Sequence, residues 1–181
     1  AVSYYVPTLF PAALGDNIPN VELLCSSLVG LVELVFTVVG MALIDKAGRK
    51  PLLVSSAAGM GVFAAIMAFA FHANIGWLVV AGACGFIACF AFGLGPVTWV
   101  MIPELFPTYM RGRASGLCTV LLWGINFCVG QFTPMMFQGW GGSGTFIFWM
   151  VMDFIGAISI AKFAPETKGK TLEEIQALWT K

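Results

Sequence analysis

An indole and a helix-interrupting proline lie close together in a long apolar segment. The segment Ala73–Pro103 contains no Asp, Glu, Lys or Arg, and within it Trp99 follows the Gly95-Pro96 pair. Proline removes a backbone hydrogen bond and clashes with the preceding helical turn, so this pair predicts a helix break that exposes backbone groups. An indole offers an apolar ring and one N–H donor. The combination suits a small ligand with an apolar face, although an indole this near to Pro103 could instead anchor the helix at a membrane surface.

A second indole lies on a mixed helical face further along the chain. Trp123 belongs to a series of residues spaced three or four apart, whose other members are small or polar, namely Gly116, Thr119, Asn126, Gly130 and Thr133. Residues at this spacing share one face of a helix. Such a face can be a packing seam between helices or the wall of a cavity, and both interpretations remain open.

Glu33 is an acid at the centre of an apolar segment. It lies in the middle of residues 21–44, where inserting a carboxyl into a membrane costs about 2.5 kcal/mol or more. Its neighbours on the helical face are small or polar, namely Ser26, Gly30, Thr37 and Gly40. We therefore expect Glu33 to face the interior of a bundle. Three roles remain open there: accepting hydrogen bonds from a ligand, carrying a proton, or hydrogen-bonding to another helix.

The composition places these residues in a membrane. Of 181 residues, 59% are hydrophobic and 10% are charged, whereas soluble domains carry about 25% charged residues. The net charge is zero, which gives no reason to expect a nucleic-acid partner. The five cysteines lie in apolar stretches without the clustering of metal ligands, and no nucleophile–base pair occurs in the loops. We therefore expect neither an enzyme nor a metal or cofactor site.

Hydropathy predicts five helices that could cross a bilayer, which takes about 20 apolar residues. They cover residues 21–44, 51–71, 75–102, 114–137 and 144–164. Residues 1–14 predict part of a further helix, so that 1–164 forms one transmembrane bundle. Residues 165–181 predict a surface tail, in which Thr171 and Glu174 form a capping box at the start of a short helix.

The basic residues predict the orientation of this bundle. All 9 Lys and Arg residues lie after the first full span, after the third, or at the C-terminal end. The alternate loops 15–20, 72–74 and 138–143 contain none. Because basic loops remain on the cytosolic side, we expect these groups and the C-terminus to be cytoplasmic, in a multi-pass protein of the plasma membrane.

Four motifs in sequence order resemble those of one membrane-protein family. They are Tyr4-Tyr5, Asp45–Lys50, the segment from Gly95 to Arg113, and Pro165–Lys170. The set resembles the sugar porters, the glucose-transporter family of the major facilitator superfamily. The resemblance implies an all-α membrane protein with the twelve-helix major facilitator fold. This chain would supply the C-terminal six-helix bundle, from part of helix seven to helix twelve, as a fragment without the N-terminal six-helix half.

The resemblance implies transport of a hexose-type sugar by alternating access, as uniport or as proton symport. It places four residues in the sugar cavity: Phe90, Trp99, Trp123 and Glu33. It assigns gating to Tyr4, Tyr5, Gly95 and Pro96. The implied partners are the sugar, protons in the case of symport, the lipid bilayer and the missing N-terminal half.

Three positions depart from the pattern of the family. Leu122 and Ala91 stand where members often carry Asn and Glu, and Glu33 replaces the usual Asn. These departures leave the identity of the sugar open. A polyol or inositol carrier, and a non-transporting sugar sensor on the same scaffold, remain as alternatives.

Six charged residues near the predicted helix ends form another candidate site, namely Asp45, Arg49, Glu104, Arg111, Arg113 and Glu166. Solvated charge at a membrane surface is one explanation, and exposed pairs contribute under about 1 kcal/mol. Acids, however, accompany the bases at each motif. Together with the resemblance, this favours a salt-bridge network that closes the cytosolic side while the outer side is open.

Overall fold

The computed structural model describes residues 21–169 of the chain. In this range the helices are α2 (Val21–Ala47), α3 (Arg49–His72), α4 (Gly76–Phe92), α5 (Leu94–Glu104) and α6 (Arg111–Phe163), and the described residues form no strand. The predicted all-α fold class is confirmed. The predicted helical segment 1–14, the pair Tyr4 and Tyr5, and the tail helix predicted after Thr171 lie outside the described residues.

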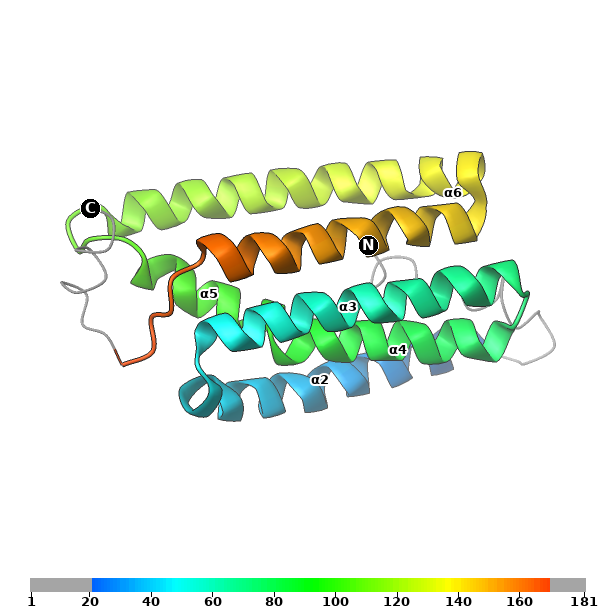
Figure 1. The fold of residues 1–181 in the computed structure, drawn as a ribbon, viewed down its shortest axis with the longest axis horizontal. Helices are drawn as coiled ribbons and strands as arrows, with labels where there is room; N and C mark the ends of the chain where they lie inside the picture. Colours follow the sequence, from blue (N-terminus) through cyan, green and yellow to red (C-terminus); the bar gives the residue numbers. More distant parts are fainter. Residues whose placement is uncertain (1–20, 170–181) are drawn as a thin grey trace.

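α6 consists of two antiparallel helices that meet at Gly141. This residue has φ 69° and ψ 177°, a non-helical backbone conformation that L side chains rarely adopt. The chain reverses its direction there, as the yellow end of α6 in Figure 1 shows. The first part of α6, before Gly141, contains the predicted span 114–137, and the second part, after Gly141, contains most of the span 144–164.

The predicted span 75–102 is two helices, and the break between them lies at Gly93 rather than at Gly95-Pro96. A proline ring clashes with the carbonyl group four residues earlier, which here belongs to Phe92, so α4 has to end before the proline is reached. Pro96 then lies in the first turn of α5, where a missing N–H costs little. The break therefore falls two residues earlier than the sequence predicted.

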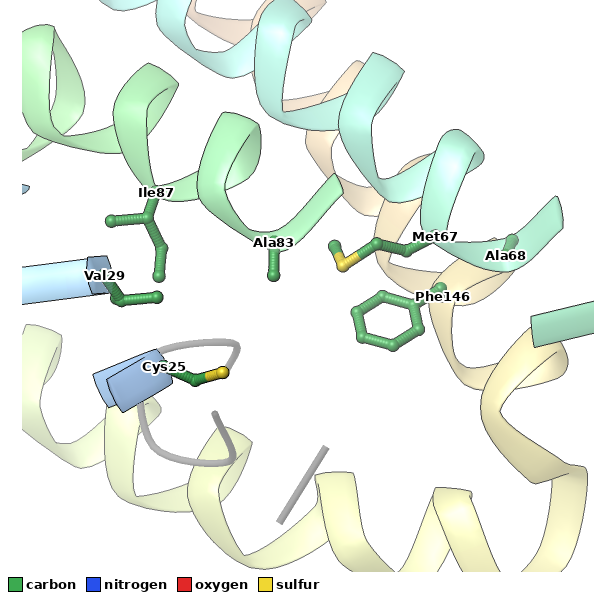
Figure 2. Packing of buried hydrophobic residues seen from close by; sticks show 7 residues of the cluster. All are labelled: Cys25, Val29, Met67, Ala68, Ala83, Ile87 and Phe146. Atoms are coloured by element: carbon green, nitrogen blue, oxygen red, sulfur yellow. The ribbon is translucent and has the colours of Figure 1, made fainter. Parts of the chain in front are cut away.

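α3 occupies the middle of the bundle. In Figure 1 it runs between α4 and the second part of α6, while the first part of α6 lies on the outside. Buried side chains from α2, α3, α4 and α6 meet in what we call the Met67 cluster: Cys25, Val29, Met67, Ala68, Ala83, Ile87 and Phe146 (Figure 2). Met67 and Ala83 are fully buried, which fixes the spacing between α3 and α4.

A second core fixes α5. Ile44 of α2, Leu52 and Leu53 of α3, and Val97 and Met101 of α5 are buried against one another. Ile160 and Ala164, at the end of α6, pack on this group. The short helix after the break is therefore held by apolar contacts with three other helices.

The bundle has the dimensions and polarity of a membrane domain. The helical segments Leu23–Ala47, Arg49–His72, Gly76–Glu104 and Arg111–Phe163 are each long and apolar enough to cross a membrane. α2 and the first part of α6 bury little of their surface and expose large side chains such as Leu31, Leu34 and Phe127. Apolar surface of this extent marks contact with lipid or with another protein.

The Lys and Arg residues among 21–169 gather at one end of the bundle. The α2–α3 turn, the loop between α5 and α6, and the exit of the chain from α6 lie together at the left of Figure 1. We call this the basic end, because the described Lys and Arg residues lie there, namely Lys46, Arg49, Lys50, Arg111, Arg113, Lys162 and Lys168. The α3–α4 turn and the reversal of the chain within α6 lie at the opposite end.

Candidate functional site

Aromatic side chains lie on both sides of the helix break. Phe90 lies in the last turn of α4 with 37% of its surface exposed, and Trp99 lies on α5 with 48% exposed. The backbone of Gly95 approaches Phe90 closely, because a Cβ atom there would lie 3.3 Å from the Phe90 carbonyl oxygen and 3.5 Å from its ring. The break thus separates two accessible aromatic residues that the apolar core does not use.

Glu33 lies on α2, which packs against α4 and α5. Its side chain is half-buried, and it forms no hydrogen bond or ion pair with any residue in the described range 21–169. Further along α2, the backbone at Gly40 reaches the break, because a Cβ atom there would lie 2.4 Å from the carbonyl oxygen of Phe92. Glu33 therefore belongs to the helix that touches the break.

Trp123 stands apart from the other aromatic site residues. It lies on the first part of α6 with 53% of its surface exposed. Within residues 21–169, the ring contacts link Trp123 to neither Phe90 nor Trp99. The structure brings α2, α4 and α5 together around the break, while Trp123 remains on a separate exposed helix.

Arg49 is the centre of the charged site at the basic end. Its Nη1 atom lies 3.4 Å from Asp45 Oδ1, and its Nη2 atom lies 3.3 Å from Glu104 Oε1. The hydroxyl of Thr167 donates a hydrogen bond of 2.7 Å to the other carboxylate oxygen of Glu104. Arg49 and Glu104 are mostly buried, whereas the Asp45 side chain is 82% exposed. The pair with Glu104 is therefore the stronger of the two.

Glu166 caps α3 from a distant part of the chain. Its carboxylate accepts hydrogen bonds from the backbone N–H groups of Arg49 (3.0 Å), Lys50 (3.1 Å) and Lys168 (2.9 Å). Gly48 makes room for this carboxylate, because a Cβ atom there would lie 2.8 Å from Glu166 Oε2. Burial alone would raise the pKa of Glu166, but the backbone donors outweigh it and hold the pKa below its ordinary value. Glu166 therefore stays ionised at the positive end of the helix.

Arg111 and Arg113, the other two bases of the predicted six-residue network, lie apart from these contacts. Among the described residues, neither side chain takes part in an ion pair. Both lie in the first turn of α6, and it is the second part of that helix that runs beside α3 (Figure 1). We call the residues that the structure does join the Arg49 cluster: Asp45, Arg49, Glu104, Glu166 and Thr167.

Two residues of these sites were not predicted. Thr167 is buried and donates a hydrogen bond to Glu104, although only Glu166 was predicted as a site residue in this motif. Ser56 on α3 is fully buried and forms hydrogen bonds on both sides of the break. No local pattern marks Ser56, because its partners lie more than thirty residues further along the chain.

Comparison with known proteins gives a consistent result. Residues 1–179 match the family described as "Sugar (and other) transporter". The chain is 40% identical over 184 residues to an arabinose-proton symporter of Bacillus subtilis, covering 100% of this chain and 39% of the relative. It is 37% identical over 185 residues to a D-xylose-proton symporter of Escherichia coli, covering 98% and 37%. A glucose facilitated diffusion protein of Zymomonas mobilis is 32% identical over 186 residues, covering 99% and 39%.

Solved structures agree with these relatives. The proton:xylose symporter XylE bound to 6-bromo-6-deoxy-D-glucose matches with TM-score 0.88 and 34% identity, covering 98% of this chain and 38% of that one. The inward-open conformation of XylE from E. coli matches with TM-score 0.81 and 34% identity, covering 98% and 42%. The chain thus spans about two fifths of the length of the proteins that it resembles.

Proposed function

Because the chain belongs to the family of sugar (and other) transporters, we propose that it helps to move a monosaccharide across a membrane by alternating access. It does so as a C-terminal six-helix bundle that pairs with an N-terminal half of similar size. We call the two together the complete transporter. Relatives named for arabinose, xylose and glucose support a pentose or hexose as the cargo.

The placement of Phe90 and Trp99 on the two sides of the helix break carries this proposal. A sugar ring presents a C–H face that packs on aromatic rings, and hydroxyl groups that need fixed donors and acceptors. The half-exposed rings meet the first need. The carboxylate of Glu33, which can accept hydrogen bonds from hydroxyl groups, meets the second. Trp123 would complete the site from the other side of the cavity.

The exposed apolar surface of the bundle agrees with its proposed pairing with an N-terminal half. α2 and the first part of α6 bury little of their surface, and they also carry Glu33 and Trp123. In the complete transporter, we propose that one face of each helix lines the cavity opposite the N-terminal half, while the other faces lipid. The isolated bundle has no second wall and would not enclose a sugar.

Uptake into vesicles tests the proposal. The complete transporter, reconstituted into liposomes, should take up labelled glucose, xylose or arabinose and exchange it with unlabelled sugar on the other side. Uptake of inositol or a polyol without uptake of these sugars would identify the alternative cargo. Binding of sugar without any uptake or exchange would instead identify a sensor.

The Arg49 cluster is proposed to close the cytosolic side. It joins α2, α3, α5 and the segment after α6 at a single end of the bundle. Gating by Gly95 and Pro96 is proposed to act through the break at Gly93, and outer gating by Tyr4 and Tyr5 remains a further proposal.

The topology follows from the basic end. We predict that Lys46 is cytosolic and that His72, an exposed residue at the opposite end, is extracellular in a plasma-membrane protein. In a variant whose native cysteines have been replaced, an impermeant thiol reagent added outside intact cells should label His72→Cys and spare Lys46→Cys. The reverse labelling pattern would overturn the orientation.

Glu33→Gln separates the proposed roles of the acid. We expect it to act as a sugar ligand, so that exchange and proton-driven accumulation fall together and the apparent KM rises roughly three- to tenfold. A proton carrier would behave differently, because exchange between preloaded vesicles would survive while accumulation driven by a pH gradient would fall. Unchanged exchange and accumulation would make Glu33 a structural carboxyl.

A further inference from the structure

The helix break at Gly93 leaves two backbone groups without their usual helical partners. In a continuous helix, the N–H of Gly93 would donate to the carbonyl of Cys89, and the N–H of Leu94 would donate to the carbonyl of Phe90. Here the N–H of Gly93 donates to Phe90 at 3.3 Å instead. The carbonyl of Cys89 and the N–H of Leu94 therefore need other partners inside an apolar bundle.

One side chain supplies both partners. The hydroxyl of Ser56, on α3, donates a hydrogen bond of 2.6 Å to the carbonyl oxygen of Cys89. The hydroxyl oxygen of Ser56 also accepts a hydrogen bond of 3.0 Å from the N–H of Leu94. A serine hydroxyl can donate once and accept as well, so a single group connects the end of α4 to the start of α5.

The packing holds this hydroxyl in place. Ser56 has no exposed surface, so no solvent competes for its hydrogen bonds. A Cβ atom on Gly93 would lie 2.4 Å from Ser56 Cβ and 2.6 Å from the carbonyl oxygen of Leu52, so only glycine allows α3 to approach the break this closely. On the other side, Gly40 brings α2 against the carbonyl of Phe92.

We propose that Ser56 is a positioning residue for the sugar site, which sets the direction of α5 relative to α4. Trp99 lies on α5, whereas Phe90 lies on α4, so the hydroxyl of Ser56 fixes the spacing of the two rings without touching the sugar. This proposal rests on the proposed transport function, but its structural part can be tested separately.

Hydrogen exchange measures the structural part directly. In the complete transporter, Ser56→Ala should speed amide exchange roughly fivefold or more in peptides that cover residues 90–97, because the N–H of Leu94 loses its acceptor. Ser55→Ala is a matched control, because Ser55 is exposed and its hydroxyl donates to Leu52 within its own helix. Equal exchange in the Ser56 and Ser55 variants would overturn the proposal.

A double-mutant cycle measures the link to the sugar site. Ser56→Ala should weaken sugar binding roughly three- to tenfold in the parent protein and should have little further effect when Trp99 is already Ala. Ser56→Cys, whose thiol is a weaker donor and acceptor, should fall between Ser and Ala in both measurements. Equal losses of binding in both backgrounds would show that Ser56 does not act through Trp99 and would refute the positioning role. A parent protein that binds no sugar would refute the transport function instead, and hydrogen exchange would still test the connection at the break.

Discussion

Trp99→Ala in the complete transporter is expected to weaken sugar binding roughly 10- to 30-fold, while folding and membrane insertion remain intact. A ring that packs on the C–H face of a sugar contributes about 1.5–2 kcal/mol through buried area and ring contact, which corresponds to that loss of affinity. The indole is 48% exposed and belongs to neither buried core, so its removal leaves no internal cavity. Equilibrium binding of labelled sugar, together with the yield of protein in the membrane, measures both effects.

A second tryptophan provides the control for this experiment. Trp77 is 68% exposed at the start of α4, at the opposite end of the bundle from the charged cluster. Its position suits an interfacial anchor, the role that Trp99 would have if it did not bind sugar. Trp77→Ala should leave sugar binding unchanged. If both variants bind like the parent protein, Trp99 is an anchor and the site has to be sought elsewhere.

The position of the helix break shows where sequence analysis reaches its limit. Pro96 announces a break, because a proline cannot continue the hydrogen bonding of a helix. The residue at which the helix breaks depends on which group forms hydrogen bonds with the backbone groups that the break releases. That group is the hydroxyl of Ser56, which lies on another helix. A contact of this kind leaves no mark in the local sequence. The helix break was therefore predicted, but its position at Gly93 and its hydrogen bonds to Ser56 were not.

The charged cluster shows the same limit at the other site. The motifs predicted that acids and bases gather at one end, and the structure joins Arg49 to Asp45 and Glu104 there. The sequence could not show which arginine pairs with these acids, because this depends on which part of α6 lies against α3. It also could not foresee that Glu166 binds backbone N–H groups at the start of α3 rather than an arginine side chain.

The second large effect is therefore expected from substitution of Arg49. Arg49→Ala in the complete transporter is expected to raise the ratio of inward-open to inward-closed protein roughly 5- to 30-fold, equivalent to about 1–2 kcal/mol. Loss of the guanidinium leaves the mostly buried carboxylate of Glu104 with only the hydroxyl of Thr167 as a partner among residues 21–169. This cost applies to the state in which the cluster is formed, so the population moves towards the open state. The pair with Asp45 adds little, because that carboxylate is exposed to water.

Distance measurements can follow this shift directly. A spin label at Lys46 and another at the cytosolic end of the N-terminal half should report a larger population of long distances in Arg49→Ala than in the parent protein. Arg113→Ala is the matched control, because it removes an exposed arginine from the same end and no described residue pairs with Arg113. Arg49→Lys should give an intermediate shift, since a single ammonium group cannot reproduce the two-pronged contact of a guanidinium. If Arg49→Ala and Arg113→Ala give the same distances, the basic end is ordinary surface charge, and closure of the cytosolic side must depend on contacts with the N-terminal half.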